Sequence, residues 1–456
     1  MFLFWPTTSR TTGRRKFAQI TRRLTALCGA LALTTGLAVT QATTATATDS
    51  LTSLGDVTGT GEIAVGGGKV FIATDDRIIV ADTEGTLTTA IAGLSEVRDL
   101  VTTPNGTRLY ATVRGSHEVT EIDTADLAIT RRIDLSAHPC PDQLALSGNW
   151  LWVSYGCPWD SSGGALGLDL STATPQPVPI DTNRLADAPQ IVASANTLVV
   201  ADFWDLRVYD LQDGAPTLRG AINSYDYALW NGWGGIALAP DGLTAYTPGS
   251  ANDINAWNLT TLTKARSYGQ EEGVLTYENI TISPDGTQMA VARSTDDVND
   301  EPLVLFDVNT GAKVELFDQS LVWFHGLAFS ASDLFAVVEK SMDSTFHLWR
   351  LDDATLPSCT IVVTGPEQAR RSQTITFTGQ LTEHDGSAPG VQPLAVAFRQ
   401  VSGTTTALPD VTTNADGTFT FTHKPTITGT LSYDVSRDNT PGSRSCKGTA
   451  TVKVRP

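Results

Sequence analysis

Aromatic side chains are concentrated in a few segments that lie between the apolar runs of this chain. The segments are 155–164, 202–206, 225–234, 271–277, 293–301 and 321–325, and their rings are Trp159, Phe203, Trp204, Tyr225, Tyr227, Trp230, Trp233, Tyr277, Trp323 and Phe324. Rigid amphipathic rings bury surface at low entropic cost, so they favour a recognition face. The alternative is that several of these rings pack inside the fold. The predicted ligand-binding residues are Trp159, Trp204, Tyr227, Trp230, Trp233, Trp323 and His325.

Histidines in the same kinds of segment could act as general acids or bases. His117, His138 and His325 fall in expected loops, whereas His347 falls in an expected strand and is interpreted as structural. Neither a GxSxG elbow nor an HExxH motif occurs in the sequence. No catalytic residue is therefore assigned.

An acidic stretch at 296–301 offers carboxylate oxygens, which calcium prefers. Its spacing fits no EF-hand pattern, because glycine is missing at the sixth position. We interpret it as a solvated acidic loop and leave calcium binding open. No metal site and no cofactor are predicted.

Seven copies of one pattern indicate which elements carry these loops. Each copy is an apolar, β-branched run that ends in a polar residue, and the closing residues are Asp82, Asp123, Asp169, Asp210, Asn258, Asp307 and Arg350. A repeat of about 40–50 residues with strands and no helices is typical of a β-propeller. The prediction is a seven-bladed β-propeller over residues 48–357, with four antiparallel strands in each blade. Loops that leave the second strand of a blade and loops that join blades then share one rim, and the aromatic segments belong to that rim.

A second marker shares this period. Pro104-Asn105-Gly106, Pro240-Asp241-Gly242 and Pro284-Asp285-Gly286 predict tight turns between the first two strands of their blades. The strand count leaves blade seven without an outer strand, while residues 51–57 have no partner of their own. We therefore predict that this N-terminal segment is the outer strand of blade seven, which closes the ring.

The first 47 residues are expected to be an export signal. Six basic residues and no acidic residue precede the apolar stretch 24–39, and Ala45-Thr46-Ala47 fits a small-x-small cleavage site. Gly13-Arg14-Arg15-Lys16 resembles a twin-arginine motif, so the Sec and Tat routes both stay open. The predicted location is secreted or associated with the cell envelope, with no transmembrane segment in the mature chain. That mature chain has 25 basic and 49 acidic residues, a net charge of −24, which disfavours nucleic acid.

Four cysteines remain after the signal is removed, and an even number in an exported protein suggests disulfides. Their spacing pairs Cys140 with Cys157 and Cys359 with Cys446. Residues 358–456 read as a second, smaller domain. Alternating segments at 360–364, 374–379, 395–400, 418–422, 430–435 and 449–454 predict a small β-sandwich.

Both parts resemble known families. The stretches 104–112, 283–291 and 306–311 are similar to exported YVTN-type propeller proteins of bacteria, often actinobacterial, although the Tyr-Val-Thr-Asn tetrapeptide is absent. The stretches 412–421 and 431–436 resemble bacterial Ig-like modules. The fold class expected is all-β, a seven-bladed propeller followed by an Ig-like β-sandwich. The resemblance implies a secreted or envelope-associated binding protein.

Three functions remain open at this stage. The first is a binding protein whose aromatic rim holds an extracellular glycan, peptide or protein partner. The second is an extracellular propeller enzyme, a lyase or hydrolase of the lactonase kind, acting at the same rim. The third is a structural part of an envelope assembly. A tight group of histidine and carboxylates at the rim would favour the enzyme, and a broad aromatic surface would favour binding.

Overall fold

The computed structural model describes residues 49–158, 163–180, 188–201, 205–212, 215–223, 235–249, 253–269, 276–294, 303–311, 313–317, 322–340, 344–354, 359–383, 386–400, 405–437 and 446–456. The predicted signal segment 1–47, the predicted domain boundary at Pro357 and the acidic stretch 296–301 lie outside these residues. None of the described helices is long and apolar enough to cross a membrane.

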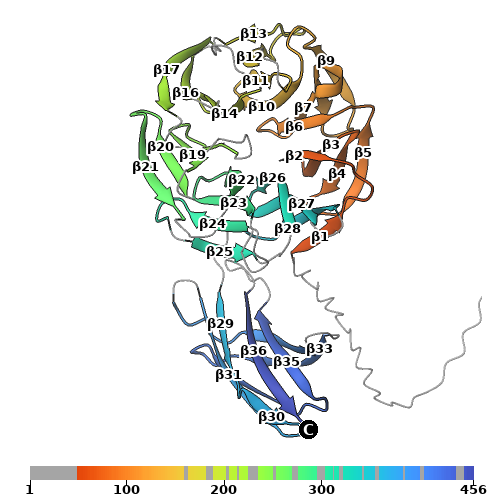
Figure 1. Cartoon of the computed structure of the whole chain (residues 1–456), viewed down its shortest axis with the longest axis vertical. Coiled ribbons are helices and arrows are strands. Elements are labelled where there is room, and N and C mark those ends of the chain that lie inside the picture. The colour runs from red at the N-terminus through yellow and green to blue at the C-terminus, as the bar shows by residue number, and fades with distance from the viewer. Residues whose placement is uncertain are drawn as a thin grey trace, which may run out of the picture. The chain divides into compact units, whose positions relative to one another are not determined.

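Seven four-stranded antiparallel sheets fill the described part of residues 49–354 (Figure 1). Blade one holds β2 Thr60–Gly66, β3 Lys69–Thr74, β4 Arg77–Asp82 and β5 Leu87–Ala92; blade two β6 Val97–Thr102, β7 Arg108–Val113, β8 Glu118–Asp123 and β9 Ile129–Asp134; blade three β10 Pro141–Ser147, β11 Trp150–Tyr155, β12 Gly164–Asp169 and β13 Val178–Pro179. Blade four holds β14 Gln190–Ser194, β15 Thr197–Ala201, β16 Asp205–Gln212 and β17 Ala215–Asn223; blade five β18 Ala237–Leu238, β19 Thr244–Pro248, β20 Ile254–Asn258 and β21 Thr263–Tyr268.

Blade six holds β22 Thr276–Ile282, β23 Gln288–Ser294, β24 Leu303–Asp307 and β25 Lys313–Phe317; blade seven β26 Val322–Ser330, β27 Asp333–Lys340, β28 Thr345–Leu351 and β1 Ser50–Ser53. A short 3-10 helix, η1 Arg114–Ser116, follows β7. The innermost strands contact one another in order, and β26 contacts β2, so the sheets form a closed ring (Figure 1). The predicted β-propeller is confirmed.

The hydrophobic core of the ring lies between blades. At the junction of blades one and seven, Ile72 and Ile79 pack with Phe335 and Leu348 in one buried cluster. The other six junctions each hold a cluster drawn from two consecutive blades. Because both faces of an inner sheet are covered, its central strands read as continuous apolar runs in the sequence. Burying one such side chain contributes about 1.5–3 kcal/mol, so each blade stabilises both neighbours.

In five repeats the polar closing residue forms an Asx turn between the third and fourth strands, at Asp82, Asp123, Asp169, Asn258 and Asp307. Asp210 instead pairs with Thr217 within the strands and accepts a bond from Arg219. Oδ1 of Asp82 accepts the backbone N–H of Thr86 at 2.8 Å, and Oδ1 of Asn258 accepts that of Thr260 at 3.0 Å. Asp and Asn bond their own following backbone in this way, which explains why they recur there. Blade seven needs a correction: the pairing of Leu334 with Leu351 places Asp352, two residues after Arg350, at the equivalent position.

Ring closure uses the N-terminal segment. β1 pairs antiparallel with β28, with Leu51 opposite Trp349, and the N–H of Leu54 donates to the carbonyl of Phe346 at 2.8 Å. The strand spans four residues, shorter than the seven-residue segment 51–57 that the sequence analysis placed there. The N–H of Asp352 donates to Oδ1 of Asp49 at 3.0 Å.

A buried arginine reinforces this closure. The Arg350 guanidinium is 2.6 Å from Asp352 and 2.9 Å from Asp333, both in blade seven. It also lies 3.6 Å from Glu84, on the outer hairpin of blade one. The arginine is nearly buried, so removing either close carboxylate would leave its charge poorly compensated.

Residues 359–456 form two sheets around one core. One sheet has the order β29-β31-β34 and the other β30-β36-β35-β32-β33. The strands are β29 Thr360–Thr364, β30 Gln368–Arg370, β31 Ile375–Thr382, β32 Pro393–Gln400, β33 Thr406–Thr412, β34 Thr418–His423, β35 Gly429–Arg437 and β36 Cys446–Arg455. The six predicted segments all correspond to strands, whereas β30 and β33 were missed. Phe377 of one sheet packs against Tyr433 of the other, with ring centroids 4.4 Å apart and the rings tilted by 41°. The Ig-like assignment of this region stays a prediction.

Both predicted disulfides are present. Cys140 and Cys157 have Cα atoms 5.1 Å apart and a sequence separation of 17. Cys359 and Cys446 have Cα atoms 5.3 Å apart and a separation of 87, so this bridge joins the start of the C-terminal region to its last strand.

Candidate functional site

The two rims of the propeller differ in their connections. On the rim that we call the turn rim, the first and second strands of each blade are joined by two to five residues, at 67–68, 103–107, 148–149, 195–196, 239–243, 283–287 and 331–332. On the opposite rim, here the loop rim, the second strand leads to the third and each blade leads to the next. The connection from β17 to β18 spans 224–236 and holds four predicted aromatic residues.

Of the seven predicted ligand-binding residues, five lie outside the described residues: Trp159, Trp204, Tyr227, Trp230 and Trp233. The described pair, Trp323 and His325, begin β26 at the loop rim. Trp323 is 52% exposed, which is unusual for an indole within a strand. Its neighbour Phe324 is buried in the junction of blades six and seven. Trp323 is therefore available to a partner while its strand is fixed by packing.

His325 belongs to the same surface but has a partner. A β-bulge between Phe324 and Gly326 places it outside the regular ladder. Its Nε2 lies 3.1 Å from Oε2 of Glu339, and its ring packs edge-on against Phe346 at 5.3 Å between centroids. These two contacts restrict the orientation of the imidazole ring. The side chains of His325 and Glu339 both remain partly exposed. The pair offers one donor–acceptor site beside Trp323.

The other two loop histidines support the disulfide at blades two and three. The N–H of Cys140 donates to Nδ1 of His117 at 3.1 Å, which fixes the histidine as an acceptor there. His138 packs edge-on against Tyr155 at 4.8 Å, and burial lowers its pKa. His347 bonds the carbonyl of Thr345 within blade seven. These contacts give the three histidines structural roles.

Three carboxylates that the sequence analysis did not single out lie on innermost strands near the loop rim. Glu62, Asp99 and Asp142 come from β2, β6 and β10, and each is partly exposed. Asp99 accepts two short backbone bonds, from the N–H of Leu100 and, across the blade junction, from that of Leu144, both at 2.6 Å. Asp99 therefore ties blade two to blade three.

The position of Asp99 repeats around the channel. In blade three it is Gln143, whose Oε1 accepts the N–H of Ile191 in blade four at 3.0 Å. In blade one it is Glu62, and the equivalent donor would be the N–H of Leu100. That donor already bonds Asp99. Glu62 is thus a member of this series whose carboxylate is not needed for the same link.

The electrostatics of the cluster follow from this arrangement. Burial, with added repulsion from Asp99 and Asp142, raises the pKa of Glu62 to about 8. Burial also raises the pKa of Asp99 to about 7, although its two backbone donors favour the charged form. Burial raises the pKa of Asp142 as well, opposed by Arg114 and Arg98. A carboxyl group that holds its proton near neutral pH can act as a hydrogen-bond donor or a general acid.

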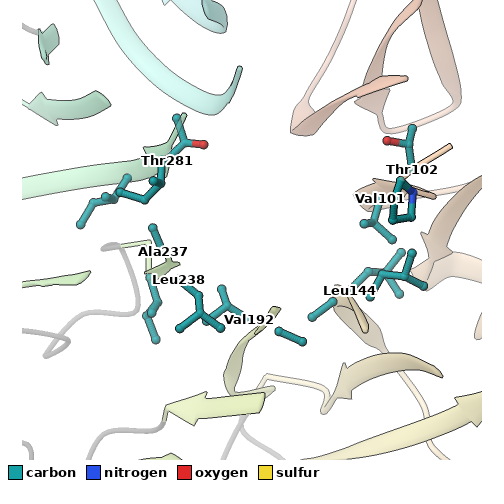
Figure 2. Close-up of a pocket in the computed structure, with 14 residues that line it drawn as sticks. Val101, Thr102, Leu144, Val192, Ala237, Leu238 and Thr281 are labelled. Atoms are coloured by element: carbon teal, nitrogen blue, oxygen red, sulfur yellow. The ribbon is translucent and has the colours of Figure 1, made fainter. Parts of the chain in front are cut away.

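Further along the channel the lining becomes apolar. A cavity of about 370 Å³ is bounded by the innermost strands of blades two to six. Figure 2 shows Val101, Leu144, Val192 and Leu238 around this space, with Thr102 and Thr281 as polar members. The cavity is comparable to the smaller ligand pockets of proteins. It has few polar groups to orient a ligand, so it is a weaker candidate than the loop rim.

The described residues contain no group of three histidine, cysteine or acidic side chains that could hold a metal ion. Sequence reasoning missed the channel carboxylates because each looks like an ordinary polar strand residue. A usable signal exists: an acid or amide directly precedes the buried apolar residue of the innermost strand in Glu62-Ile63, Asp99-Leu100, Gln143-Leu144, Gln190-Ile191 and Asn279-Ile280. The interblade bond is present for Asp99 and Gln143, whereas the buried Oε1 of Gln190 has no hydrogen-bond partner among the described residues, so the pattern locates these side chains without fixing the role of each.

Comparison with solved structures gives the fold. A chain of the structure described as Crystal Structure of Mitotic Checkpoint Complex matches with a TM-score of 0.54 and 14% sequence identity. The match covers 73% of this chain and 99% of that chain. The protein is therefore an all-β protein with a WD40-like propeller. No family model and no curated protein matches the chain.

Proposed function

We propose that this protein is a secreted or envelope-associated binding protein whose loop rim holds an extracellular partner. The observation that carries the proposal is Trp323, an indole 52% exposed on a strand that is otherwise packed. An exposed ring of this size is a typical anchor for a partner, and it is a liability when unused. The predicted aromatic residues in the neighbouring loop-rim connections support the same face.

A protein or peptide partner is favoured over a glycan at this rim. Propellers of the WD40-like kind typically serve as interaction scaffolds, and fold alone carries that argument only as an analogy. The pair of His325 and Glu339 adds hydrogen-bonding capacity next to the indole, which suits a polypeptide backbone. The acidic mature chain favours a partner with a basic surface.

The test compares two exposed apolar side chains on opposite rims. Trp323→Ala is measured against Leu243→Ala, whose side chain is 49% exposed in a turn of blade five on the turn rim. Both proteins are immobilised and exposed to the extracellular fraction of the source cells. The retained partner is then titrated against each variant.

Truncating the indole should weaken binding by about tenfold, because a central aromatic anchor is worth more than about 1 kcal/mol. Leu243→Ala should bind as the wild type does. Equal retention by both variants, at matched melting temperature, would remove Trp323 from the binding face.

A hydrolase or lyase is the second candidate, and the raised pKa of Glu62 is the observation that favours it. A neutral carboxylic acid at a channel mouth could donate a proton to a leaving group. The test is a screen of lactones and polysaccharides for turnover by the wild type and by Glu62→Gln. Turnover that the variant loses, with its fold intact, would support the enzyme.

A further inference from the structure

A groove on the turn rim lies between blades three and four, away from the rim discussed above. It has a volume of about 440 Å³. Its floor is Trp150 and Trp152 of β11, and its walls are the turns that contain Asn149 and Asn196. Asp169 and Ser171 close one side. The lining residues carry two amides, two hydroxyls and a carboxylate around an aromatic surface, and include no lysine or arginine.

The indole of Trp150 is held in a fixed orientation by the indole of Trp152. Trp150 and Trp152 stack with ring centroids 5.7 Å apart and an interplanar angle of 19°. Trp152 is buried and Trp150 is partly exposed, so the stack supports one indole that lines the groove. A rigid ring loses little entropy on binding, which makes it an efficient platform.

Gly167 makes this stack possible. It pairs with Trp152 across the ladder. A Cβ atom built on it would lie 2.7 Å from Trp152 and 3.0 Å from Trp150. The equivalent position is Val80 in blade one, Val208 in blade four and Leu305 in blade six. A side chain there would displace both indoles, so the glycine is a local departure from the repeat.

Trp150 itself is the second departure at the same place. It pairs with Asp169, the Asx residue that closes its repeat. The residue that pairs with the closing position is Lys69 in blade one, Arg108 in blade two, Thr197 in blade four, Thr244 in blade five and Gln288 in blade six. Five blades thus use polar residues where blade three uses tryptophan. Trp150 packs against the buried cluster between blades three and four but stays partly exposed where it lines the groove.

The polar walls are positioned by backbone bonds. The carbonyl of Asn149 accepts the N–H of Leu170, and that of Asn196 accepts the N–H of Leu211, at 2.9 and 2.8 Å. Both asparagine side chains are exposed, so their amides can turn toward a ligand. Oδ1 of Asp169 accepts both the N–H and the hydroxyl of Ser171, at 3.0 and 2.6 Å. The carboxylate is therefore held in place at the edge of the groove.

We propose that this groove binds a neutral sugar or an amino sugar, with one face of a pyranose ring stacked on Trp150. The flat apolar face of the sugar would cover the indole while Asn149, Asn196 and Asp169 take its hydroxyl groups. An anionic sugar is disfavoured, because the groove lining offers a carboxylate and no cation. The site is separate from the proposed loop-rim function and does not depend on it.

The test uses the full mature chain and isothermal titration with short oligomers of glucose, mannose, galactose, N-acetylglucosamine and glucosamine. At least one oligomer should bind the wild type. Trp150→Ala should then weaken binding about tenfold, and Trp150→Phe less, because a smaller ring still stacks. Trp323→Ala should bind as the wild type does, which separates this site from the loop rim.

Two further variants test the groove without truncating Trp150. Gly167→Ala changes none of the lining residues but displaces the two indoles among them, so it should also weaken binding. Asn196→Ala changes an exposed side chain and should weaken binding several-fold through a lost hydrogen bond. The proposal is overturned if none of the oligomers binds the wild type, if Trp150→Ala and Asn196→Ala both bind normally, or if Trp323→Ala alone abolishes binding.

Discussion

The propeller and the C-terminal region bring the ends of their folds together in different ways. The propeller closes through non-covalent contacts, in which β1 adds to β28 and Arg350 links blade seven to blade one. The C-terminal region is closed by the Cys359–Cys446 disulfide. A strand that docks stabilises the folded state by what it buries, whereas a disulfide acts mainly by restricting the unfolded chain. The two regions should therefore respond to different changes.

The largest effect is expected from removing the closing strand. A chain that lacks residues 49–54 loses the pairing of β1 with β28 and the buried side chain of Leu54, and it leaves β28 as an open edge. We expect the free energy of unfolding of the propeller to fall on the order of 5 kcal/mol. Tryptophan fluorescence is the measurement, because residues 359–456 contain no tryptophan and the signal reports the propeller.

The matched control for this deletion is a chain that begins at Asp49. It keeps β1 and should unfold as the full-length chain does. If the shorter chain without 49–54 melts at the same temperature as this control, β1 contributes no stability to the ring.

The next effect is expected from the C-terminal disulfide. Cys359→Ala combined with Cys446→Ala opens a loop of 87 residues. The chain-entropy model predicts that a disulfide closing a loop of this length stabilises the folded state by about 4–5 kcal/mol. Hydrogen exchange at Leu431 and Val452, both fully buried in this region, measures the loss. Tryptophan fluorescence should stay unchanged, and a shift of the propeller transition would contradict the separation of the two closures.

A smaller effect is expected from the disulfide within the propeller. Cys140 and Cys157 enclose only 17 residues, for which the same model gives about 3 kcal/mol. The combined Cys140→Ala and Cys157→Ala change keeps the backbone N–H of residue 140, so the bond to Nδ1 of His117 should remain. The measurement is the thermal transition by tryptophan fluorescence beside hydrogen exchange at Gly156, whose N–H bonds the Cys140 carbonyl. A loss of stability as large as that from removing the Cys359–Cys446 disulfide would contradict the dependence on loop length.

Much of this architecture could be predicted from the sequence because it repeats. Asp82, Asp123 and Asp307 mark turns by a local hydrogen bond, and a local cause leaves a regular trace. In blade seven the closing position of the repeat was assigned to the wrong residue, because the fourth strand of this blade comes from the N-terminal segment. The fourth strand of this blade is β1, so the pattern of a closing residue followed by a hairpin is lost at Asp352 and Arg350 looks like the marker. The turn residue therefore marks the repeat correctly where the third strand leads to the fourth, and incorrectly in blade seven, where it does not.

The site could be predicted only in part. Trp323 was singled out because a large ring in an expected loop is conspicuous by type; the structure shows that the ring is exposed and lies in β26, and its role in binding stays a prediction. Glu62 and Asp99 were not, because their pKa values are raised mainly by burial in the folded ring, with a smaller contribution from carboxylates on other blades. The groove at Trp150 was missed for a similar reason. It depends on Gly167, on an adjacent strand, and on the turn of the next blade.

The smallest predicted effect concerns pH and the propeller closure alone. Glu62 lies at the junction of blades one and seven, where a Cβ on Gly326 would come within 2.9 Å of its Oε2. Its pKa is raised from 4.5 to about 8 in the folded protein, so the folded state binds this proton more tightly than the unfolded state. Its stabilising contribution is complete at low pH and is lost as the pH rises toward about 8.

Glu62→Gln keeps the side chain neutral and should remove this loss. We expect the variant to match the wild type near pH 4 and to exceed it on the order of 1–3 kcal/mol near pH 9, from urea unfolding followed by tryptophan fluorescence. Glu367→Gln, which changes an exposed carboxylate of the disulfide-closed region, is the control and should leave the profile unchanged. If the free energy of unfolding depends on pH in the same way for Glu62→Gln and the wild type, ionisation of Glu62 does not destabilise the folded protein. The non-covalent closure would then be as insensitive to pH as the covalent one.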